Sequence, residues 1–242
     1  MAFDVTSSPF LLGAVIDFHL KKYSEGSEET TENTISTIEK LRKSFYVENC
    51  VTSIENDKEL RVFVKEASLV FAEAKFDLRV WEYSDPSLEN RAKTVVLGLT
   101  WQRKADSLAV NNLDLVGVEV VTRRSMVSLA QRVFDPIGFT CPISLRPKLL
   151  LQKCWKVKGG WDQEVPEVVK NDFLLWLREL PPPEEIKIPR WLRGIEERVV
   201  NCSLHKFCDA SKAAYMAANF VRTEYNTCVQ VQLVQARSRV TA

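Results

Sequence analysis

Residues 122–138 read Thr-Arg-Arg-Ser-Met-Val-Ser-Leu-Ala-Gln-Arg-Val-Phe-Asp-Pro-Ile-Gly, a helical pattern that stops abruptly. The apolar side chains at 126, 129, 130 and 133 repeat at the spacing of one face of an α-helix. Asp135-Pro136-Ile137-Gly138 then ends the pattern, because proline lacks an N–H and Asp and Gly favour turns. The stretch predicts an amphipathic helix closed by a turn.

Downstream, the same helical spacing continues and then changes to a strand pattern. A second helix is expected to begin at Leu149–Val157, and a third, capped by Asp162, to end at Pro181-Pro182-Pro183. The triproline and the residues up to Arg190 predict a linker. Strands are then expected at Leu204–Cys208, Tyr215–Arg222 and Val229–Arg237. They predict a three-stranded sheet with one uncovered face, which is not a complete domain.

Upstream, the pattern mixes helices and short strands. Helices are expected from Pro9 to about Tyr23, around Ile35–Leu41, and over Asp57–Lys75. A strand–turn–strand is expected at Phe45–Ser53, and further strands at Asp77–Trp81, Lys93–Trp101, Ser107–Val110 and Leu113–Val118. The fold class predicted for the whole chain is therefore α+β.

Composition excludes several classes of protein. Apolar residues make up 45% and charged residues 27%, an ordinary globular balance. The six cysteines include no C-x-x-C pair and there are two histidines, which excludes the usual zinc spacings. The N-terminus lacks the pattern of a signal peptide or a membrane span. We expect an intracellular protein, cytoplasmic or nuclear, that is not secreted and has no membrane partner.

Positive charge is concentrated in residues 121–160. This block holds eight Lys and Arg against one Asp, a net charge of +7, whereas the whole chain carries +1. Interleaved Phe134, Phe139 and Trp155 make it suitable for a phosphate-backbone surface. A solvated helix face is the competing interpretation and is favoured on charge alone.

Two acidic positions are candidate metal ligands. Glu48, beside Asn49 in the tip Phe45–Asn49, would stand at a sheet surface where a divalent cation could bind. Asp209 follows the apolar strand that ends in Phe207-Cys208. An ordinary acidic turn and a turn-capping Asp are the competing interpretations, and on local grounds they are preferred.

The order of short segments along the chain adds a resemblance. In the first half they are TSSPFLL at 6–12, FYVEN at 45–49, FDLRVW at 76–81 and VLGLTW at 96–101. In the second half they are TRRS at 122–125, RVFDPIG at 132–138, RPKLLLQ at 146–152 with Trp155 and Trp161, and LHKFCDAS at 204–211. In this order the chain resembles the Pol polyprotein of a Bel/Pao-type LTR retrotransposon.

The resemblance implies a partial reverse-transcriptase palm with a helical thumb/connection, followed by an incomplete RNase H-like sheet. It places the C-terminal part of the palm at 1–120, the thumb/connection-like region at 121–200 and an N-terminal RNase H-like fragment at 201–242. Its implied nucleic-acid-binding residues are Leu97, Gly98 and Trp101 of a primer-grip hairpin, and Arg123, Arg124, Arg132, Arg146 and Lys148. The implied partners are an RNA/DNA primer–template and the remainder of the polyprotein.

The family polymerase holds two Mg²⁺ ions with an upstream Asp and a Y-V-D-D turn, and this chain departs from that pattern. Glu48 and Asn49 occupy the degenerate turn, Asp209 matches the first RNase H carboxylate, and Asp4 replaces a favoured Gly. Glu48 and Asp209 are thus the metal-ligand candidates, but Mg²⁺ demands near-ideal octahedral geometry, so we expect no productive binding.

We therefore expect a catalytically inactive fragment of an RNA-directed DNA polymerase/RNase H polyprotein. The main alternative is a host-retained nucleic-acid-binding or scaffolding protein that uses the basic thumb-like surface. A truncated gene assignment for an intact polyprotein and an unrelated α+β protein remain further readings.

Overall fold

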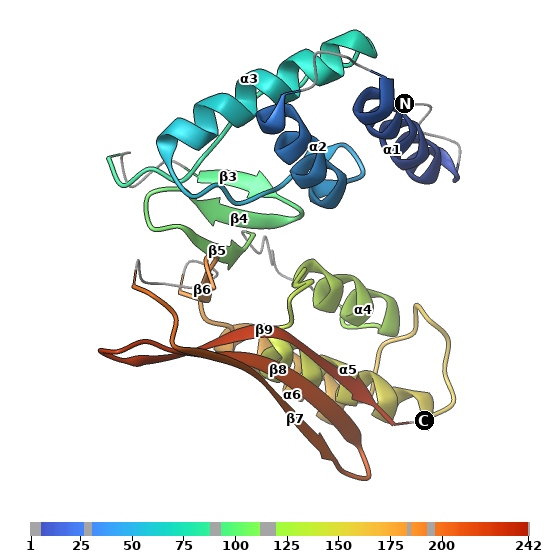
Figure 1. Ribbon diagram of the computed structural model, residues 1–242. Coiled ribbons are helices and arrows are strands. Elements are labelled where there is room, and N and C mark those ends of the chain that lie inside the picture. The colour runs from blue at the N-terminus through green and yellow to red at the C-terminus, as the bar shows by residue number, and fades with distance from the viewer. Residues whose placement is uncertain are drawn as a thin grey trace. The chain divides into compact units, whose positions relative to one another are not determined.

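The computed structural model describes residues 6–26, 31–87, 93–111, 120–182, 185–192 and 197–241 (Figure 1). The chain forms two compact units, Met1–Tyr83 and Ser84–Ala242. Helices and antiparallel strands are both present, so the predicted mixed α+β class is confirmed. Within the described segments, no helix has the length and apolar character that crossing a membrane would need.

The first unit packs three helices: α1 (Ser8–Gly26), α2 (Glu32–Ser44) and α3 (Asp57–Glu73). The side chains of Thr31 and Asn56 cap α2 and α3 by accepting hydrogen bonds from backbone N–H groups in their first turns. The core is formed by Ile16, Leu20, Ile38, Leu41, Phe63, Ala67, Val70 and Phe71. The predicted helical stripe of α3 therefore supplies half of these core positions.

A short hairpin follows α2. Strands β1 (Phe45–Tyr46) and β2 (Asn49–Cys50) pair antiparallel, with Tyr46 opposite Asn49. Val47 in the connecting turn has φ 57°, which is unfavourable for a β-branched residue. The predicted strand–turn–strand is confirmed, although its strands are only two residues long.

The predicted strand at Asp77–Trp81 is wrong. This segment forms no strand, pairs with none among the described residues, and has Val80 at φ 56°. Leu78 and Trp81 instead pack on the helical core, with the Trp81 ring 6.2 Å from that of Phe63. Alternating apolar residues indicate that every second side chain is buried. In this segment the burying surface is the helical core rather than a neighbouring strand.

The second unit begins with an antiparallel sheet of order β3-β4-β5-β6. Its strands are β3 (Lys93–Val96), β4 (Leu99–Gln102), β5 (Ser107–Val110) and β6 (Lys187–Pro189). Strand β6 lies in the predicted linker and pairs with β5, so that linker prediction is corrected. Such a short pairing across nearly eighty residues leaves no local sequence signal. The predicted strand at Leu113–Val118 lies outside the described residues.

Three helices follow: α4 (Arg123–Arg132), α5 (Cys141–Trp155) and α6 (Glu167–Glu179). Helix α4 lies where its apolar stripe predicted a helix, and it opens with a capping box between Thr122 and Ser125. Helix α5 begins eight residues before the predicted start, because Pro142 lies in its first turn and Pro147 is accommodated inside it. Helix α6 is preceded by Pro166, not by Asp162, which corrects the predicted cap.

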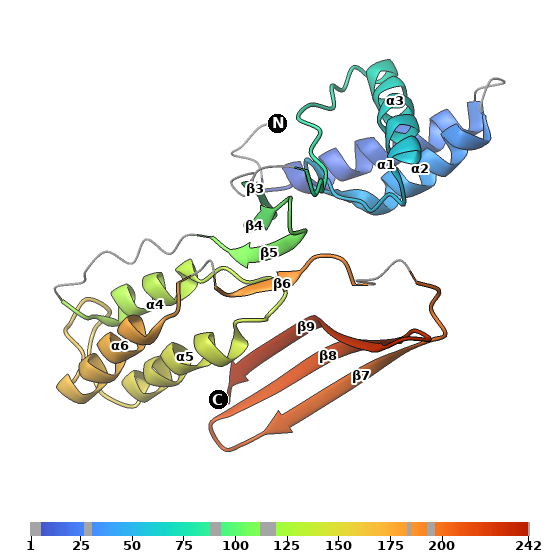
Figure 2. The same cartoon turned by 90° about the vertical axis from the view of Figure 1, so that its left-hand side faces the viewer.

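The predicted C-terminal strands are confirmed as β7 (Asn201–Ala210), β8 (Ala214–Glu224) and β9 (Val229–Val240), in that order in one antiparallel sheet. Helix α5 packs against β9, and Figures 1 and 2 show it beside one face of the sheet. Cys141 of α5 forms a small core with Ala218 and Ala236. A bulge at Asn219/Phe220 interrupts the register between β8 and β9.

The turn after α4 joins the helices to this sheet. Asp135 accepts hydrogen bonds from the backbone N–H groups of Ile137, Gly138 and Thr140, and from the Thr140 hydroxyl. Ala236 of β9 donates its N–H to the carbonyl of Ile137 at 2.7 Å. Gly138 has φ 95°, and a Cβ there would overlap the backbone carbonyl of Ala236. The turn therefore requires glycine at this position.

Candidate nucleic-acid interface

Glu48 and Asn49 lie at the tip of the β1–β2 hairpin, and both side chains are exposed. Asn49 is paired through its backbone with Tyr46, whose ring is 65% exposed. The local geometry matches the acidic hairpin tip that the sequence predicted. A role in metal binding stays a prediction.

Asp209 lies on β7 opposite Met216 of β8 and is exposed. In the segments that the structure describes, no three His, Cys, Asp or Glu side chains gather into a group that could hold a metal ion. Mg²⁺ needs several oxygen ligands in octahedral geometry. Glu48 and Asp209 are candidate ligands of two different centres, one in each compact unit, and metal binding by either stays a prediction.

The hairpin proposed as a primer grip is built as expected, but its tryptophan is internal. Leu97 (φ 49°) and Gly98 (φ 82°) form the two-residue turn, and a Cβ on Gly98 would overlap the Phe134 ring. Trp101 is only 8% exposed, and its Nε1 donates to Asp106 at 2.9 Å. The Arg190 guanidinium lies 5.2 Å from the Trp101 ring centroid. Leu97 is accessible to a ligand, whereas Trp101 serves the core.

Arg123 is 8% exposed and closes the C-terminal end of α5. Its guanidinium donates to the backbone carbonyls of Cys154, Val157 and Gly159 at 2.5–2.6 Å. It also lies 5.2 Å from the Trp155 ring centroid. Burial raises the pKa of the Cys154 thiol, and the positive charge of Arg123 opposes that rise. The geometry thus gives Arg123 a structural role.

The other predicted cations also have partners within the protein. Arg124 makes a two-point ion pair with Asp162, and its hydrogen bond holds the pKa of the Asp162 carboxyl below its usual range. Arg146 pairs with Glu179, and Lys148 Nζ lies 3.5 Å from the Ser238 carbonyl oxygen. Arg132 is exposed, and it too has an interaction partner within the protein. Their binding to nucleic acid stays a prediction.

Cations and aromatic rings gather on the exposed surface at the end of α5. We define the α5-end surface as Trp155, Lys156, Lys158 and Trp161. Both tryptophans are about half exposed, with their ring centroids 5.1 Å apart. Both lysines are exposed, and no ion pair to either is found in the described part of the chain. This part of the basic block is therefore available to a ligand.

A further group of cationic residues was not predicted from the sequence, because its members are far apart along the chain. The strand register places Lys206 of β7 on the same sheet face as Arg237 and Arg239 of β9. The two arginines alternate with buried Ala236 and Ser238. That period-two pattern was the one sequence signal that could have placed both arginines on one sheet face. It did not indicate which β7 residue would lie on the same face.

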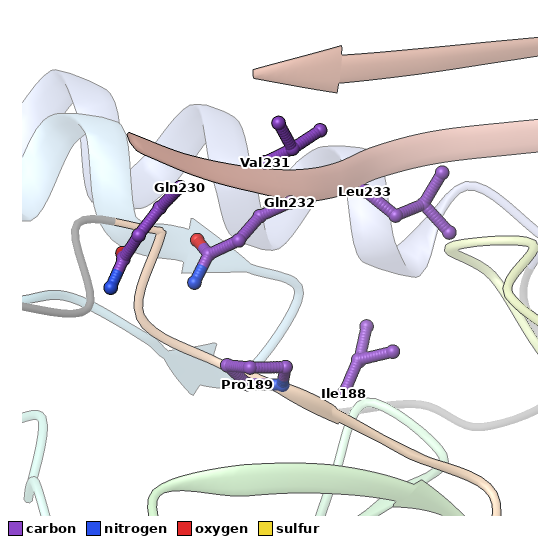
Figure 3. Close-up of a pocket in the computed structure, with 6 residues that line it drawn as sticks. All are labelled: Ile188, Pro189, Gln230, Val231, Gln232 and Leu233. Atoms are coloured by element: carbon purple, nitrogen blue, oxygen red, sulfur yellow. The ribbon is translucent and has the colours of Figure 1, made fainter. Parts of the chain in front are cut away.

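Glutamines of β9 line a pocket of about 310 Å³ beside β6. Figure 3 shows Gln230 and Gln232 extending toward Pro189. The side-chain oxygens of both glutamines are buried, and neither accepts a hydrogen bond from the residues that the structure describes. Figure 3 draws the amide nitrogens of both glutamines nearer to Pro189 than their oxygens, so the pocket presents side-chain amide groups.

Replacing Arg123 with Lys separates a structural role from phosphate binding. Lys keeps the charge but cannot reach three carbonyls at once, so we expect the free energy of unfolding to fall by about 2–3 kcal/mol. Urea unfolding followed by circular dichroism measures it. Arg124→Lys is the matched control and should cost under about 1 kcal/mol, because that ion pair is exposed. Equal stability of the two variants would contradict the structural role.

The sequence profile of one known family matches residues 122–242, which is half of the chain. That family is described as the Pao retrotransposon-like RNaseH-like domain. The matched region opens at Thr122, the N-cap of α4, and includes α4–α6 and the β7–β8–β9 sheet. A search of curated proteins found no match. The chain therefore belongs to the Pao retrotransposon-like RNaseH-like domain family.

Proposed function

We propose that this chain is a segment of a retrotransposon Pol polyprotein that has no polymerase or RNase H activity by itself. Membership of the Pao family supports the retrotransposon origin of residues 122–242. The ordered reverse-transcriptase-like segments at 6–12, 45–49, 76–81 and 96–101 support a palm-derived first half. Residues 1–120 would then be the C-terminal part of the palm, 121–200 the thumb/connection, and 201–242 the beginning of the RNase H-like domain.

The placement of the carboxylates carries the proposal of inactivity. Phosphoryl transfer by two metal ions requires several oxygen ligands that converge on both ions. Glu48 is exposed at a hairpin tip of the first unit, and Asp209 is exposed on a strand of the second. Asn49, whose side chain is a neutral amide, occupies the position of the second Asp in the family's Y-V-D-D turn. Among the described residues, no three His, Cys, Asp or Glu side chains converge on one point, which supports the absence of both reactions.

A second candidate function is sequence-independent binding of nucleic acid at the α5-end surface. Lys156 and Lys158 supply positive charge, while Trp155 and Trp161 offer exposed ring faces to unpaired bases. The chain would then act as a binding or scaffolding element for an RNA/DNA primer–template or for the remainder of the polyprotein. The internal pairing of Arg123, Arg124 and Arg146 narrows the predicted basic surface to this end of α5.

Primer extension tests the main proposal. The purified chain, an RNA template with an annealed DNA primer, deoxynucleotides and Mg²⁺ or Mn²⁺ should give no extended product, because the ligands for two ions do not converge. Parallel incubation with an RNA/DNA hybrid should leave the RNA uncut. Extension that is lost in Glu48→Ala, or RNA cleavage that is lost in Asp209→Asn, would contradict the proposal and exclude a contaminating enzyme.

The α5-end surface is tested by Lys156→Gln/Lys158→Gln. Each lost phosphate contact to a duplex lowers the slope of log affinity against log salt by about 0.9, so the slope should fall by about 2. Fluorescence anisotropy with a labelled primer–template measures it. Lys22→Gln/Lys65→Gln, two exposed lysines of the first unit, is the matched control. An unchanged slope in the α5-end variant would sink this second candidate.

A further inference from the structure

The β7–β8–β9 sheet has two chemically different faces. Its inner face packs against α5 through Ala218 and Ala236, and the side chains of Phe220 and Leu233 pack against the same small core. Side chains alternate between faces along each strand. The opposite side, which we call the outer face, therefore carries the residues between these positions. The bulge at Asn219/Phe220 shifts the alternation on β9 by one residue.

Fifteen strand residues make up the outer face by this register. They are Cys202, Leu204, Lys206, Cys208 and Ala210 of β7, Tyr215, Ala217, Asn219, Val221 and Thr223 of β8, and Gln230, Gln232, Gln235, Arg237 and Arg239 of β9. This set has three cations and no carboxylate, a net charge of +3. The chain as a whole carries +1. The outer face is thus a concentration of unbalanced positive charge.

Its cations have no ion-pair partner in the described segments, whereas the predicted arginines of the helices have partners within the protein. Lys206, Arg237 and Arg239 are all exposed, and none of them forms an ion pair in the segments described by the structure. Arg222, which lies on the inner face, pairs with Glu224. The two arginines of β9 are two residues apart, and strand geometry separates them by about 7 Å. Such a row of cations complements a polyanion that lies along the strand.

An aromatic ring lies beside the cations. Tyr215 of β8 is the register partner of Arg239, so both project from the outer face. Tyr215 is 47% exposed. On a sheet surface, an exposed ring next to cations can stack an unpaired base while the cations contact its phosphates. The paired bases of a duplex are stacked on one another and cannot use this ring.

The glutamine end of the same face offers hydrogen-bond acceptors. Gln230 and Gln232 lie nearer to the N-terminus of β9 than Arg237 and Arg239. The side-chain oxygens of both glutamines are buried and have no hydrogen-bond partner among the described residues. They face the pocket beside Pro189 of β6 (Figure 3). Exocyclic amino groups of bases are suitable donors for such acceptors. In a duplex each base is held in a pair and in the stack, so it cannot enter the pocket without leaving the duplex.

We propose that the outer face of the β7–β8–β9 sheet binds single-stranded nucleic acid. Lys206, Arg237 and Arg239 contact phosphates, and Tyr215 stacks on a base. The side-chain amides of Gln230 and Gln232 form hydrogen bonds with a base that enters the pocket beside β6. This site is separate from the α5-end surface and does not depend on binding there.

The test compares Lys206→Gln/Arg237→Gln/Arg239→Gln with wild type. The probe is a fluorescein-labelled single-stranded oligonucleotide of mixed sequence, titrated by anisotropy over a range of salt concentrations. Each lost contact to a single strand lowers the salt slope by about 0.7, so the slope should fall by about 2. Lys22→Gln/Lys58→Gln/Lys65→Gln removes the same charge from exposed positions of the first unit and should retain the wild-type slope.

Tyr215 separates base stacking from charge. Tyr215→Ala should weaken binding about tenfold with an unchanged salt slope, whereas Tyr215→Phe retains the ring and should bind like wild type. Circular dichroism and the melting temperature establish that each variant is folded. Equal binding by Tyr215→Ala and Tyr215→Phe would overturn the stacking role.

Competition and protection experiments address the remaining outcomes. Unlabelled duplex of the same sequence, and polyglutamate, should each displace the probe far less effectively than unlabelled single strand. Acetylation of Lys206, followed by mass spectrometry, should be suppressed by the oligonucleotide, while Lys22 remains reactive. Displacement by duplex or by polyglutamate at the same concentration would overturn the proposal, as would unprotected Lys206. Loss of binding in the α5-end variant alone would also overturn it, while leaving the second candidate function intact.

Discussion

The close approach of the Gly138 turn to β9 is the constraint on which the second unit depends. No side chain fits between Gly138 and the carbonyl of Ala236, so the turn backbone and the strand backbone can touch. The Asp135 carboxylate holds that turn in shape by satisfying three backbone N–H groups. Because the turn leads directly into α5, it fixes that helix against one face of the sheet. The opposite face is thereby not covered by α5.

Features with a local cause could be predicted from the sequence. The stripe and capping residues specify α4, Asp135-Pro136-Ile137-Gly138 specifies its end, and alternation specifies the strands of the C-terminal sheet. Features fixed by distant partners could not be predicted. Strand β6 forms only by pairing with β5, and Trp101 is internal because Asp106 and Arg190 engage its ring. The start of α5 was predicted too late, since the helix begins at Cys141 and accommodates both Pro142 and Pro147.

The candidate site was predictable in its chemistry and only partly in its location. The basic block of residues 121–160 is real in sequence, but in the fold Arg123 is buried against three carbonyls and Arg124 is paired with Asp162. Charge counted along the chain cannot distinguish such internal partners from ligand contacts. In the described segments, exposed cations without an ion pair include Lys156 and Lys158 at the end of α5. They also include Lys206, Arg237 and Arg239 of the outer sheet face, which strand register brings together.

Hydrogen exchange in Gly138→Ala tests most directly whether the turn fixes the sheet. Gly160→Ala is the matched control, because a Cβ on Gly160 would meet nothing within 4 Å. We predict that the amides of β9 and of α5 exchange together at least about tenfold faster in Gly138→Ala, since the overlap with Ala236 must separate the two elements. Gly160→Ala should exchange like wild type in the same peptides. Faster exchange confined to residues 135–140, with β9 and α5 unchanged, would contradict the account.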